Sequence, residues 1–396
     1  MKKDMKGHEM SCMGRKTLHL CASLLLILLF ILGCSQTPRV SSSAPLKETG
    51  LSAEPWSEAD RLFTGDPHWL GGDGASSVDL GKGRILWLFG DSFINPGLSR
   101  SRQESVVIRN SIALQSGYNP AGATVRFFWN MDPSGPAPFF GPPAEGWYWP
   151  GAGIMVDQRL LIFLMKIRSA SNDLGFEAYG WSAVAIDNSG DDPPFWTIRA
   201  LAQSSDSYNV VVGSGSILKI GDHVYAFGVD PARQDLFLVR WGVESIQKGD
   251  LTNPQWWTGG SSGWVEQSAL EKRPTEIISQ VQVECTVHYE PVVERFVHIQ
   301  SGDLMNPVLE ARLSSAITGP WSSPMRFYQP QDAGDPRLLY YACKAHPELA
   351  GSDIVFTYAV NTLDEHRLLT DQTIYFPRFL KGTWNGPTVR SGSGNP

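Results

Sequence analysis

The chain has 396 residues, and its 33 lysines and arginines against 40 aspartates and glutamates give a formal net charge of −7. This acidic balance argues against nucleic acid as a partner, because surfaces that bind phosphate backbones are basic. The sequence also lacks a Gly-x-x-x-x-Gly-Lys loop, a Cys-x-x-Cys pair and a His-Glu-x-x-His pair, so no nucleotide, redox or zinc motif is present.

The first predicted element is a targeting segment at residues 1–34. A basic pair at 15–16 precedes the apolar run 18–32, which is short for a membrane span and ends next to Cys34. This pattern is typical of a bacterial lipoprotein signal cut before the cysteine; an ordinary cleaved signal and a retained anchor are the alternatives. We therefore expect a lipid on Cys34 that anchors the protein to a membrane of the bacterial cell envelope, at the outer membrane or cell surface.

The rest of the chain divides into a flexible tether at 35–54, one domain at 55–385 and a flexible tail at 386–396. Without residues 1–33 the chain keeps 28 basic and 38 acidic residues, a net charge of −10. Cys285 and Cys343 would then be the two thiols outside the lipid anchor. They could form a disulfide in an oxidising compartment, or lie unpaired in buried strands.

The domain is predicted to be all-β, because long stretches with helical periodicity are absent. At most, short helices or single turns are expected at 243–248 and 264–272. A dense apolar strand recurs five times, and each copy follows a strand of small residues and precedes a third, apolar or alternating strand. The apolar strands are 85–89, 160–165, 223–228, 295–299 and 353–360. The strands before them are 71–80, 151–156, 213–220, 282–289 and 345–349, and those after them are 106–115, 181–186, 236–241, 309–313 and 372–377.

Five copies at intervals of roughly 55 to 70 residues are typical of a β-propeller, in which small sheets repeat around an axis. Small residues fit the first strand of each blade because that strand lines the central channel. We therefore predict a five-bladed β-propeller, in preference to a β-sandwich.

The hairpin at 71–93 places one acid before its first strand and another after its second. Asp73 lies between glycines, and Asp91 follows the strand 85–89. Glycines beside an acid allow the backbone and a ligand to approach closely. Two acids at one end of a hairpin suit carbohydrate chemistry, although Gly-Asp pairs also form simple turns.

Several segments resemble bacterial secreted families of unknown function, numbered 5005 and 4185. The similar segments are 72–78, 86–93, 109–113, 149–153, 213–216, 358–361 and the start of the strand at Glu284. These families are similar to the furanosidase propellers of glycoside hydrolase families 43 and 32. The resemblance implies a propeller with two catalytic carboxyl groups at the channel, but full copies of the sucrase-type motifs are missing, so no particular sugar is implied.

Glycoside hydrolysis needs two carboxyl groups at one bond: one protonates the leaving oxygen, and the other attacks or activates water. By resemblance, Asp73 matches the first acid and Glu284 the proton donor. Burial among valines would raise the pKa of Glu284 towards use as a general acid. We expect Asp73 to be the base or nucleophile and Asp91 to be a third acid that adjusts charge. Turn-forming or ion-paired structural acids are the alternative.

Further polar and aromatic residues are candidates for substrate binding. Arg109 and Asn110 open a strand and could bind a sugar, although Arg109 could equally pair with Asp91. Trp149 could stack on a sugar ring. Ser214 belongs to the Gly-Ser-Gly-Ser motif of the resemblance, and His346 could reach the channel or be structural. We expect no cofactor and no metal among the site residues, with a channel calcium ion as the alternative.

Together these observations predict a cell-surface lipoprotein that acts as a glycoside hydrolase on a furanose-containing or related polysaccharide. The alternative is a non-catalytic propeller that binds glycans or a protein partner. We expect the protein to act as a monomer.

Overall fold

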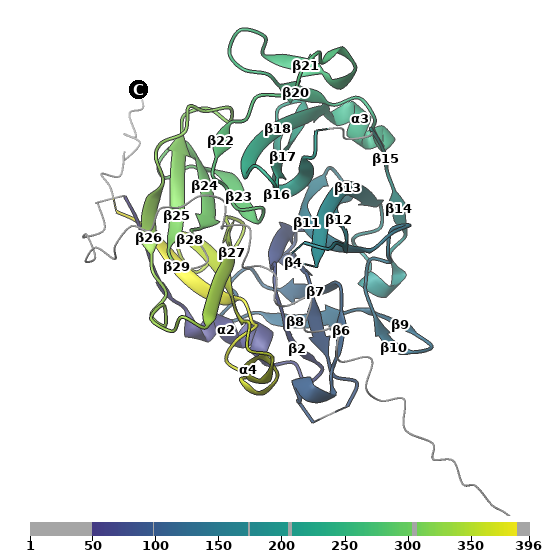
Figure 1. Ribbon diagram of the computed structural model, residues 1–396, viewed down its shortest axis with the longest axis vertical. Helices are drawn as coiled ribbons and strands as arrows, with labels where there is room; N and C mark the ends of the chain where they lie inside the picture. Colours follow the sequence, from purple (N-terminus) through teal and green to yellow (C-terminus); the bar gives the residue numbers. More distant parts are fainter. Residues whose placement is uncertain (1–49, 98, 173–174, 205–207, 303–306, 386–396) are drawn as a thin grey trace, which may run out of the picture.

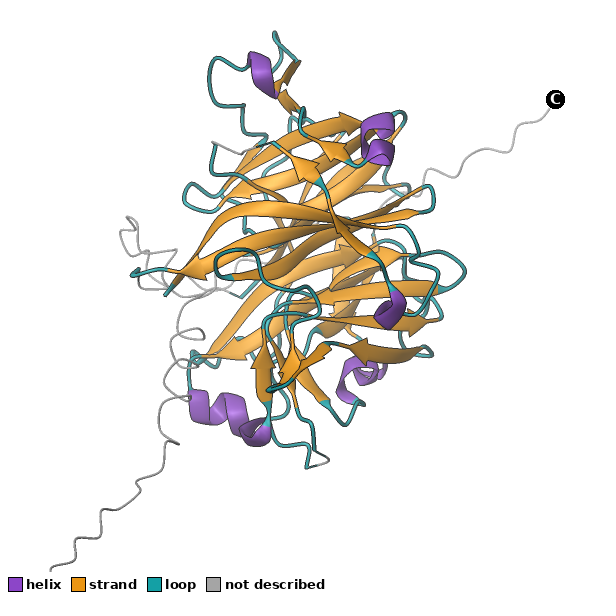
Figure 2. Cartoon of the chain, turned by 90° about the vertical axis from the view of Figure 1, so that its right-hand side faces the viewer, coloured by secondary structure: helices purple, strands orange, loops and turns teal. Residues whose placement is uncertain are grey.

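The computed structural model describes residues 50–97, 99–172, 175–204, 208–302 and 307–385. The predicted signal peptide with Cys34, residues 35–49 of the tether and the tail 386–396 lie outside these residues. In the described part, strands form sheets around a common centre, and the few short helices lie at the edges (Figures 1 and 2). The prediction of an all-β propeller is confirmed.

Five of the sheets have four or more strands. The first contains β3 (Ser76–Asp79), β4 (Arg84–Phe89), β7 (Ser111–Ser116) and β8 (Thr124–Phe128). The second contains β11 (Trp147–Val156), β12 (Arg159–Ser169), β13 (Phe176–Ile186) and β14 (Ile198–Ala200). The third contains β16 (Val211–Ile220), β17 (His223–Asp230), β18 (Asp235–Gly242), β20 (Gln255–Trp257), β21 (Trp264–Glu266) and β22 (Ile278–Ser279). The fourth contains β23 (Cys285–Glu290), β24 (Arg295–Ser301), β25 (Leu309–Ser314) and β26 (Met325–Tyr328). The fifth contains β27 (Leu338–His346), β28 (Ile354–Thr362), β29 (Arg378–Trp384) and β1 (Leu51–Pro55).

Shorter elements connect these sheets. One small sheet contains β2 (Trp69–Gly72), β5 (Ser92–Ile94) and β6 (Val106–Ile108), and two pairs contain β9 (Asn130–Asp132) with β10 (Gly135–Ala137) and β15 (Ala202–Gln203) with β19 (Asp250–Leu251). The α-helices are α2 (Ser57–Thr64), α3 (Val243–Lys248) and α4 (Glu365–Thr370). The 3₁₀ turns are η1 (Arg102–Glu104), η2 (Pro193–Phe195) and η3 (Gln267–Ala269). Within the described ranges, every helix is too short or too polar to span a membrane.

The core consists of apolar clusters between neighbouring sheets. One cluster joins the first and second sheets, one the second and third, one the third and fourth, one the fourth and fifth, and one the fifth and first. Each sheet therefore buries both faces, which explains why β4 is an almost continuous apolar run instead of an alternating one. Cys285 and Cys343 lie in two of these clusters as buried free thiols, so the structure favours core residues over a disulfide.

The ring closes by pairing the two ends of the domain. Strand β1 runs antiparallel to β29, with Leu51 opposite Trp384 and Pro55 opposite Leu380. Residues 51–54 were expected in the tether, but they are the outer strand of the fifth sheet. The structured domain thus begins before residue 55.

The innermost strands β3, β11, β16, β23 and β27 meet at the centre, where three of them have irregular pairing. The register shifts between Pro150 and Gly153, between Val212 and Ile217, and between Tyr341 and Lys344. A side chain on Gly151 would collide with the carbonyl of Gly213, so glycine is what lets β11 and β16 approach. Such bulges commonly redirect side chains beside functional sites.

Some predicted elements differ from the structure. The expected first strand at 71–80 is interrupted between β2 and β3, and the innermost strand of the fifth sheet is β27, not 345–349. The segment 372–377 is a loop, and β29 takes its place in the sheet. Its apolar residues Ile374 and Phe376 are buried without strand pairing, because Tyr375 has a left-handed backbone with φ 62°. The short helix at 243–248 is confirmed, whereas 264–272 forms β21 and η3, and α2 and α4 were not predicted.

Candidate functional site

Three acids lie where strands of the first and fourth sheets begin or end near the channel. Asp73 follows β2 and precedes β3, Asp91 follows β4, and Glu284 precedes β23. Because β4 runs antiparallel to β3, the end of β4 returns to the start of β3. The backbone N–H of Gly90 donates to the carbonyl of Asp73 at 2.9 Å and fixes this return. All three residues are intermediate in exposure, and the side chains of Asp91 and Glu284 are 14 % and 26 % exposed.

Asp73 and Glu284 are neighbours across two sheets. A Cβ atom added to Gly74 would lie 3.6 Å from Oε1 of Glu284, and one added to Gly90 would lie 2.5 Å from Oδ1 of Asp73. Gly90 therefore leaves the space that the Asp73 carboxyl occupies, and the ordinary contact distance at Gly74 places Glu284 beside the residue that follows Asp73. The structure thus brings together two acids that are far apart in the sequence, as expected.

The carboxyl group of Asp73 accepts hydrogen bonds from two tyrosines. Tyr341 donates to Oδ2 at 2.8 Å, and Tyr375 donates to the same oxygen at 3.4 Å. Burial, followed by the charges of Glu284 and Asp91, raises the pKa of Asp73 well above its usual range, while the two tyrosines oppose this shift. The upward shift is stronger at Asp73 than at Asp91.

Glu284 is paired with a buried cation. Nζ of Lys344, whose side chain is 3 % exposed, lies 3.6 Å from Oε1 of Glu284, whose side chain is 26 % exposed. Lys344 comes from β27, directly after the register shift. Its ammonium group can stabilise negative charge that develops on Glu284 when this group gives up a proton.

Asp91 is held by an arginine and a tryptophan. Arg109 donates to Oδ2 at 3.0 Å, and Nε1 of Trp149 donates to Oδ1 at 2.8 Å. Burial raises the pKa of Asp91, and the charge of Arg109 acts in the opposite direction. The pairing of Arg109 with Asp91, one of the two alternatives, is therefore the one observed.

Three aromatic side chains, which form an aromatic wall, pack together beside Asp91: Trp147, Trp149 and Phe176. The rings of Trp149 and Phe176 are 4.9 Å apart and edge to face, and the guanidinium carbon of Arg109 lies 4.1 Å from the ring centre of Trp147. The three aromatic residues are half-buried, so part of their surface is accessible. Such a wall can stack against a sugar ring.

Three predicted substrate-binding residues are not available at this site. Asn110 is fully buried and bonds Phe140 and Tyr148, which fixes the loop before β11. Ser214 is buried in β16 and accepts the N–H of Val229. These polar groups are used within the protein, so the prediction that they bind substrate is wrong.

His346 is the third of these residues. It is 1 % exposed, and its ring contacts the hydroxyls of Ser77 and Thr357 at 2.5 and 2.8 Å. Burial lowers the pKa of His346 to about 3, so it is neutral at physiological pH. His346 also lines the cavity in the channel, so it reaches the channel, and its ring is held by hydrogen bonds within the protein.

Comparison with known proteins identifies the family. Residues 57–382 match the family described as "Domain of unknown function (DUF5005)". The chain belongs to this family. The resemblance to family 5005 is thereby confirmed, whereas the one to family 4185 stays an expectation. No curated protein matches the sequence significantly.

One solved structure shares the fold of this DUF5005 member, and two others are more distantly similar. A candidate hydrolase from Bacteroides ovatus ATCC 8483 is 15 % identical with a TM-score of 0.68, and the match covers 88 % of this chain and 97 % of that one. The catalytic domain of the GH62 α-L-arabinofuranosidase from Coprinopsis cinerea is 10 % identical (TM-score 0.47, 86 % and 98 % covered). An exo-β-1,3-galactanase from Phanerochaete chrysosporium, bound to β-1,3-galactotriose, is 11 % identical (TM-score 0.46, 83 % and 62 % covered).

Sequence reasoning missed Tyr341, Tyr375 and Lys344, which contact the two principal acids. The segment Tyr358 to Asn361 was part of the resemblance, and Nδ2 of Asn361 donates to the hydroxyl of Tyr341 at 3.4 Å. Asn361 therefore pointed to a polar partner in β27, the strand that precedes its own strand β28, and Tyr341 is that partner. Nothing in the local sequence marks Tyr375.

A cavity of about 260 Å³ is lined by all five innermost strands and borders the candidate site through Lys344. His288 and Lys344 are among its lining residues, and both ring nitrogens of His288 lack a hydrogen-bond partner among the described residues. Within that part of the chain, no three His, Cys, Asp or Glu side chains are placed to hold a metal ion. The channel calcium ion therefore stays an untested alternative.

Proposed function

We propose that the protein is a glycoside hydrolase whose catalytic pair is Asp73 and Glu284. The observation that supports it best is the meeting of two carboxyl groups from different sheets, close enough for the charge of Glu284 to raise the pKa of Asp73. A pair of carboxyl groups is what hydrolysis of a glycosidic bond requires. The propeller fold shared with the Bacteroides ovatus structure is compatible with this proposal.

In the proposed reaction the bond between the anomeric carbon and the leaving oxygen breaks. Glu284 gives its proton to that oxygen, and Lys344 stabilises the carboxylate that forms. Asp73, as the base, takes a proton from the attacking water, or attacks the anomeric carbon itself. Asp91 and its partner Arg109 set the charge beside Asp73, and Trp149 offers a ring face to the sugar.

For the substrate we propose a furanose-containing or related polysaccharide. The test is sugar release by the purified full chain from arabinan, arabinoxylan and a galactofuranose polymer, with an Asp73→Asn/Glu284→Gln double variant as the control. We expect release from at least one polymer by the parent and none by the double variant. Retention of a polymer by the parent without any release would instead favour glycan capture, the non-catalytic alternative.

We further propose that the protein is a monomeric lipoprotein of the cell envelope, anchored through Cys34. Cells fed an alkyne-labelled palmitate should label the parent and a Cys21→Ala control equally. The Cys34→Ala variant should carry no label and leave the membrane fraction, because the acyl chains supply the anchoring free energy. Persistent labelling of Cys34→Ala would contradict the proposal.

A further inference from the structure

We propose that Tyr341 and Tyr375 are positioning residues that keep Asp73 ionised for its role as the base. This inference rests on the proposed function and deepens it. In this inference the two tyrosine hydroxyls lower the pKa of Asp73, an effect that a purely structural hydroxyl would not have.

The contacts place both hydroxyls on one oxygen of Asp73. Tyr341 donates to Oδ2 at 2.8 Å, and the single hydroxyl proton of Tyr375 is shared between Oδ2 at 3.4 Å and the carbonyl oxygen of Asp91 at 3.2 Å. Both tyrosines are buried. Burial and the nearby charge of Asp73 raise the pKa of each phenol well above its usual range, so both hydroxyls keep their protons as donors.

Asp73 needs such donors because its surroundings favour the neutral acid. The charged and titratable groups that face it or its partners are Glu284, Asp91, Lys344, Arg109, Arg102, Tyr341 and Tyr375. Among the described residues no lysine or arginine forms an ion pair with Asp73, since Lys344 contacts Glu284 and Arg109 contacts Asp91. Hydrogen bonds to the carboxylate are thus the direct means of keeping it charged.

The backbone around the tyrosines is strained. Tyr375 has φ 62° and Ala342, next to Tyr341, has φ 51°, both in the left-handed region that residues other than glycine rarely adopt. The N–H of Tyr375 donates to the carbonyl of Val360, and its carbonyl accepts the N–H of Gly72 at 3.0 Å. Strain of this kind persists where surrounding contacts enforce it, and it gathers at functional sites.

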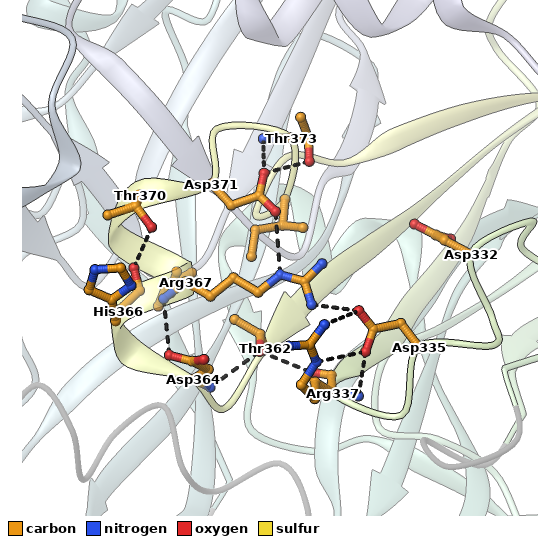
Figure 3. A network of polar contacts seen from close by, with 12 residues as sticks. Asp332, Asp335, Arg337, Thr362, Asp364, His366, Arg367, Thr370, Asp371 and Thr373 are labelled. Atoms are coloured by element: carbon orange, nitrogen blue, oxygen red, sulfur yellow. Dashed lines mark hydrogen bonds and ion pairs between the residues drawn. The ribbon is translucent and has the colours of Figure 1, made fainter.

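A polar network fixes the two segments that carry the tyrosines (Figure 3). Arg367 of α4 joins Asp335, in the loop before β27, to Asp371, in the loop that leads to Tyr375, at 2.6 and 3.3 Å. Arg337 adds two further bonds to Asp335. The network therefore holds the segment with Tyr375 against the start of the strand with Tyr341.

The first test is the pH dependence of kcat/KM with 4-nitrophenyl α-L-arabinofuranoside. A base acts only when ionised, so activity falls as pH drops through the pKa of Asp73. Tyr341→Phe removes a donor to the carboxylate and raises that pKa, so the acidic limb should move up by about 0.5–1 pH unit, with activity on the plateau within a few-fold of the parent. Tyr118→Phe, which loses an exposed hydroxyl bond to Asp79, is the matched control and should show no shift.

The second test needs no substrate. Because the pKa of Asp73 is higher in the folded than in the unfolded protein, its stabilising contribution is present at low pH and is lost as pH rises through the folded pKa. Because Tyr341→Phe raises the folded pKa of Asp73 further, the loss of stability with rising pH continues to a higher pH in the variant than in the parent. The difference in Tm between parent and variant should therefore widen as pH rises from about 4, the ordinary pKa of an aspartate, through the raised pKa of Asp73. This widening should vanish in an Asp73→Asn background.

The outcomes separate this inference from the proposed function. An unchanged acidic limb and a constant Tm difference for Tyr341→Phe, together with inactivity of Asp73→Asn, would overturn the role of the tyrosines and leave the hydrolase proposal standing. Full activity of Asp73→Asn would overturn the hydrolase proposal itself.

Discussion

Asp73→Asn should lower the rate of glycoside cleavage with both aryl and alkyl substrates, and Glu284→Gln should lower it with the alkyl substrate, each by about 10²–10⁴-fold, the usual loss when a positioned general acid or base is removed. Both replacements keep the size and shape of the side chain, so the fold should persist. In Asp73→Asn the oxygen of the introduced amide would still accept the hydrogen bond of Tyr341. Rates with an aryl and an alkyl α-L-arabinofuranoside, together with circular dichroism of each variant, measure the effect.

The leaving group distinguishes the two roles. A 4-nitrophenol leaves without protonation, so Glu284→Gln should lose little with the aryl substrate and most of its activity with the alkyl one. Asp73→Asn should be impaired with both, because the attack of water or of the carboxylate itself is lost. If the aryl substrate instead rescues Asp73→Asn and leaves Glu284→Gln inactive, the roles are exchanged, an outcome that the raised pKa of Asp73 makes worth measuring.

Asp132→Asn is the matched control for these variants. Asp132 is an exposed acid in β9 whose carboxylate accepts hydrogen bonds from Ser134 in the turn that follows. Its replacement should leave both substrates cleaved at the parental rate. Wild-type turnover in both Asp73→Asn and Glu284→Gln would contradict the catalytic assignment.

The strands that could be predicted are those whose hydrophobic pattern is visible in a short stretch of sequence. Strands such as β4 and β17 are apolar on both faces because sheets pack on both sides, and this pattern is visible without a structure. The segment 372–377 is apolar and was predicted as a strand, but it is a loop in the structure. It is buried like a strand, yet the left-handed backbone of Tyr375 and its bonds to Val360 and Gly72 prevent regular pairing.

The candidate site was predictable only in part, for a similar reason. Asp73 and Glu284 stand in recognisable local settings, between glycines or at the start of an inner strand. Tyr341 and Tyr375 reach Asp73 across 268 and 302 residues of sequence, and only ring closure brings them together. Asn110 and His346 are polar residues near strand ends, a pattern shared by ligands and by buried structural residues, so burial alone separates the two.

Arg102→Met should destabilise the folded chain by about 4 kcal/mol, which is large for a single replacement. Arg102 is 1 % exposed and donates to four carbonyl oxygens: to Leu70 before Asp73, and to Leu368, Asp371 and Ile374 before Tyr375. Burial lowers the pKa of Arg102 to about 10, so it stays charged at pH 7. Methionine fills much of the space but leaves these carbonyls without their donor.

Arg100→Met is the natural comparison, because Arg100 is a nearby exposed arginine that donates to the carbonyl oxygens of Thr64 and Gly65. Water can replace it there, so this variant should change stability by no more than about 0.5 kcal/mol. Urea unfolding followed by tryptophan fluorescence measures both variants. A loss below about 1 kcal/mol for Arg102→Met would show that its carbonyl partners find other donors. Arg102 would then not be what joins the strand before Asp73 to the loop of Tyr375.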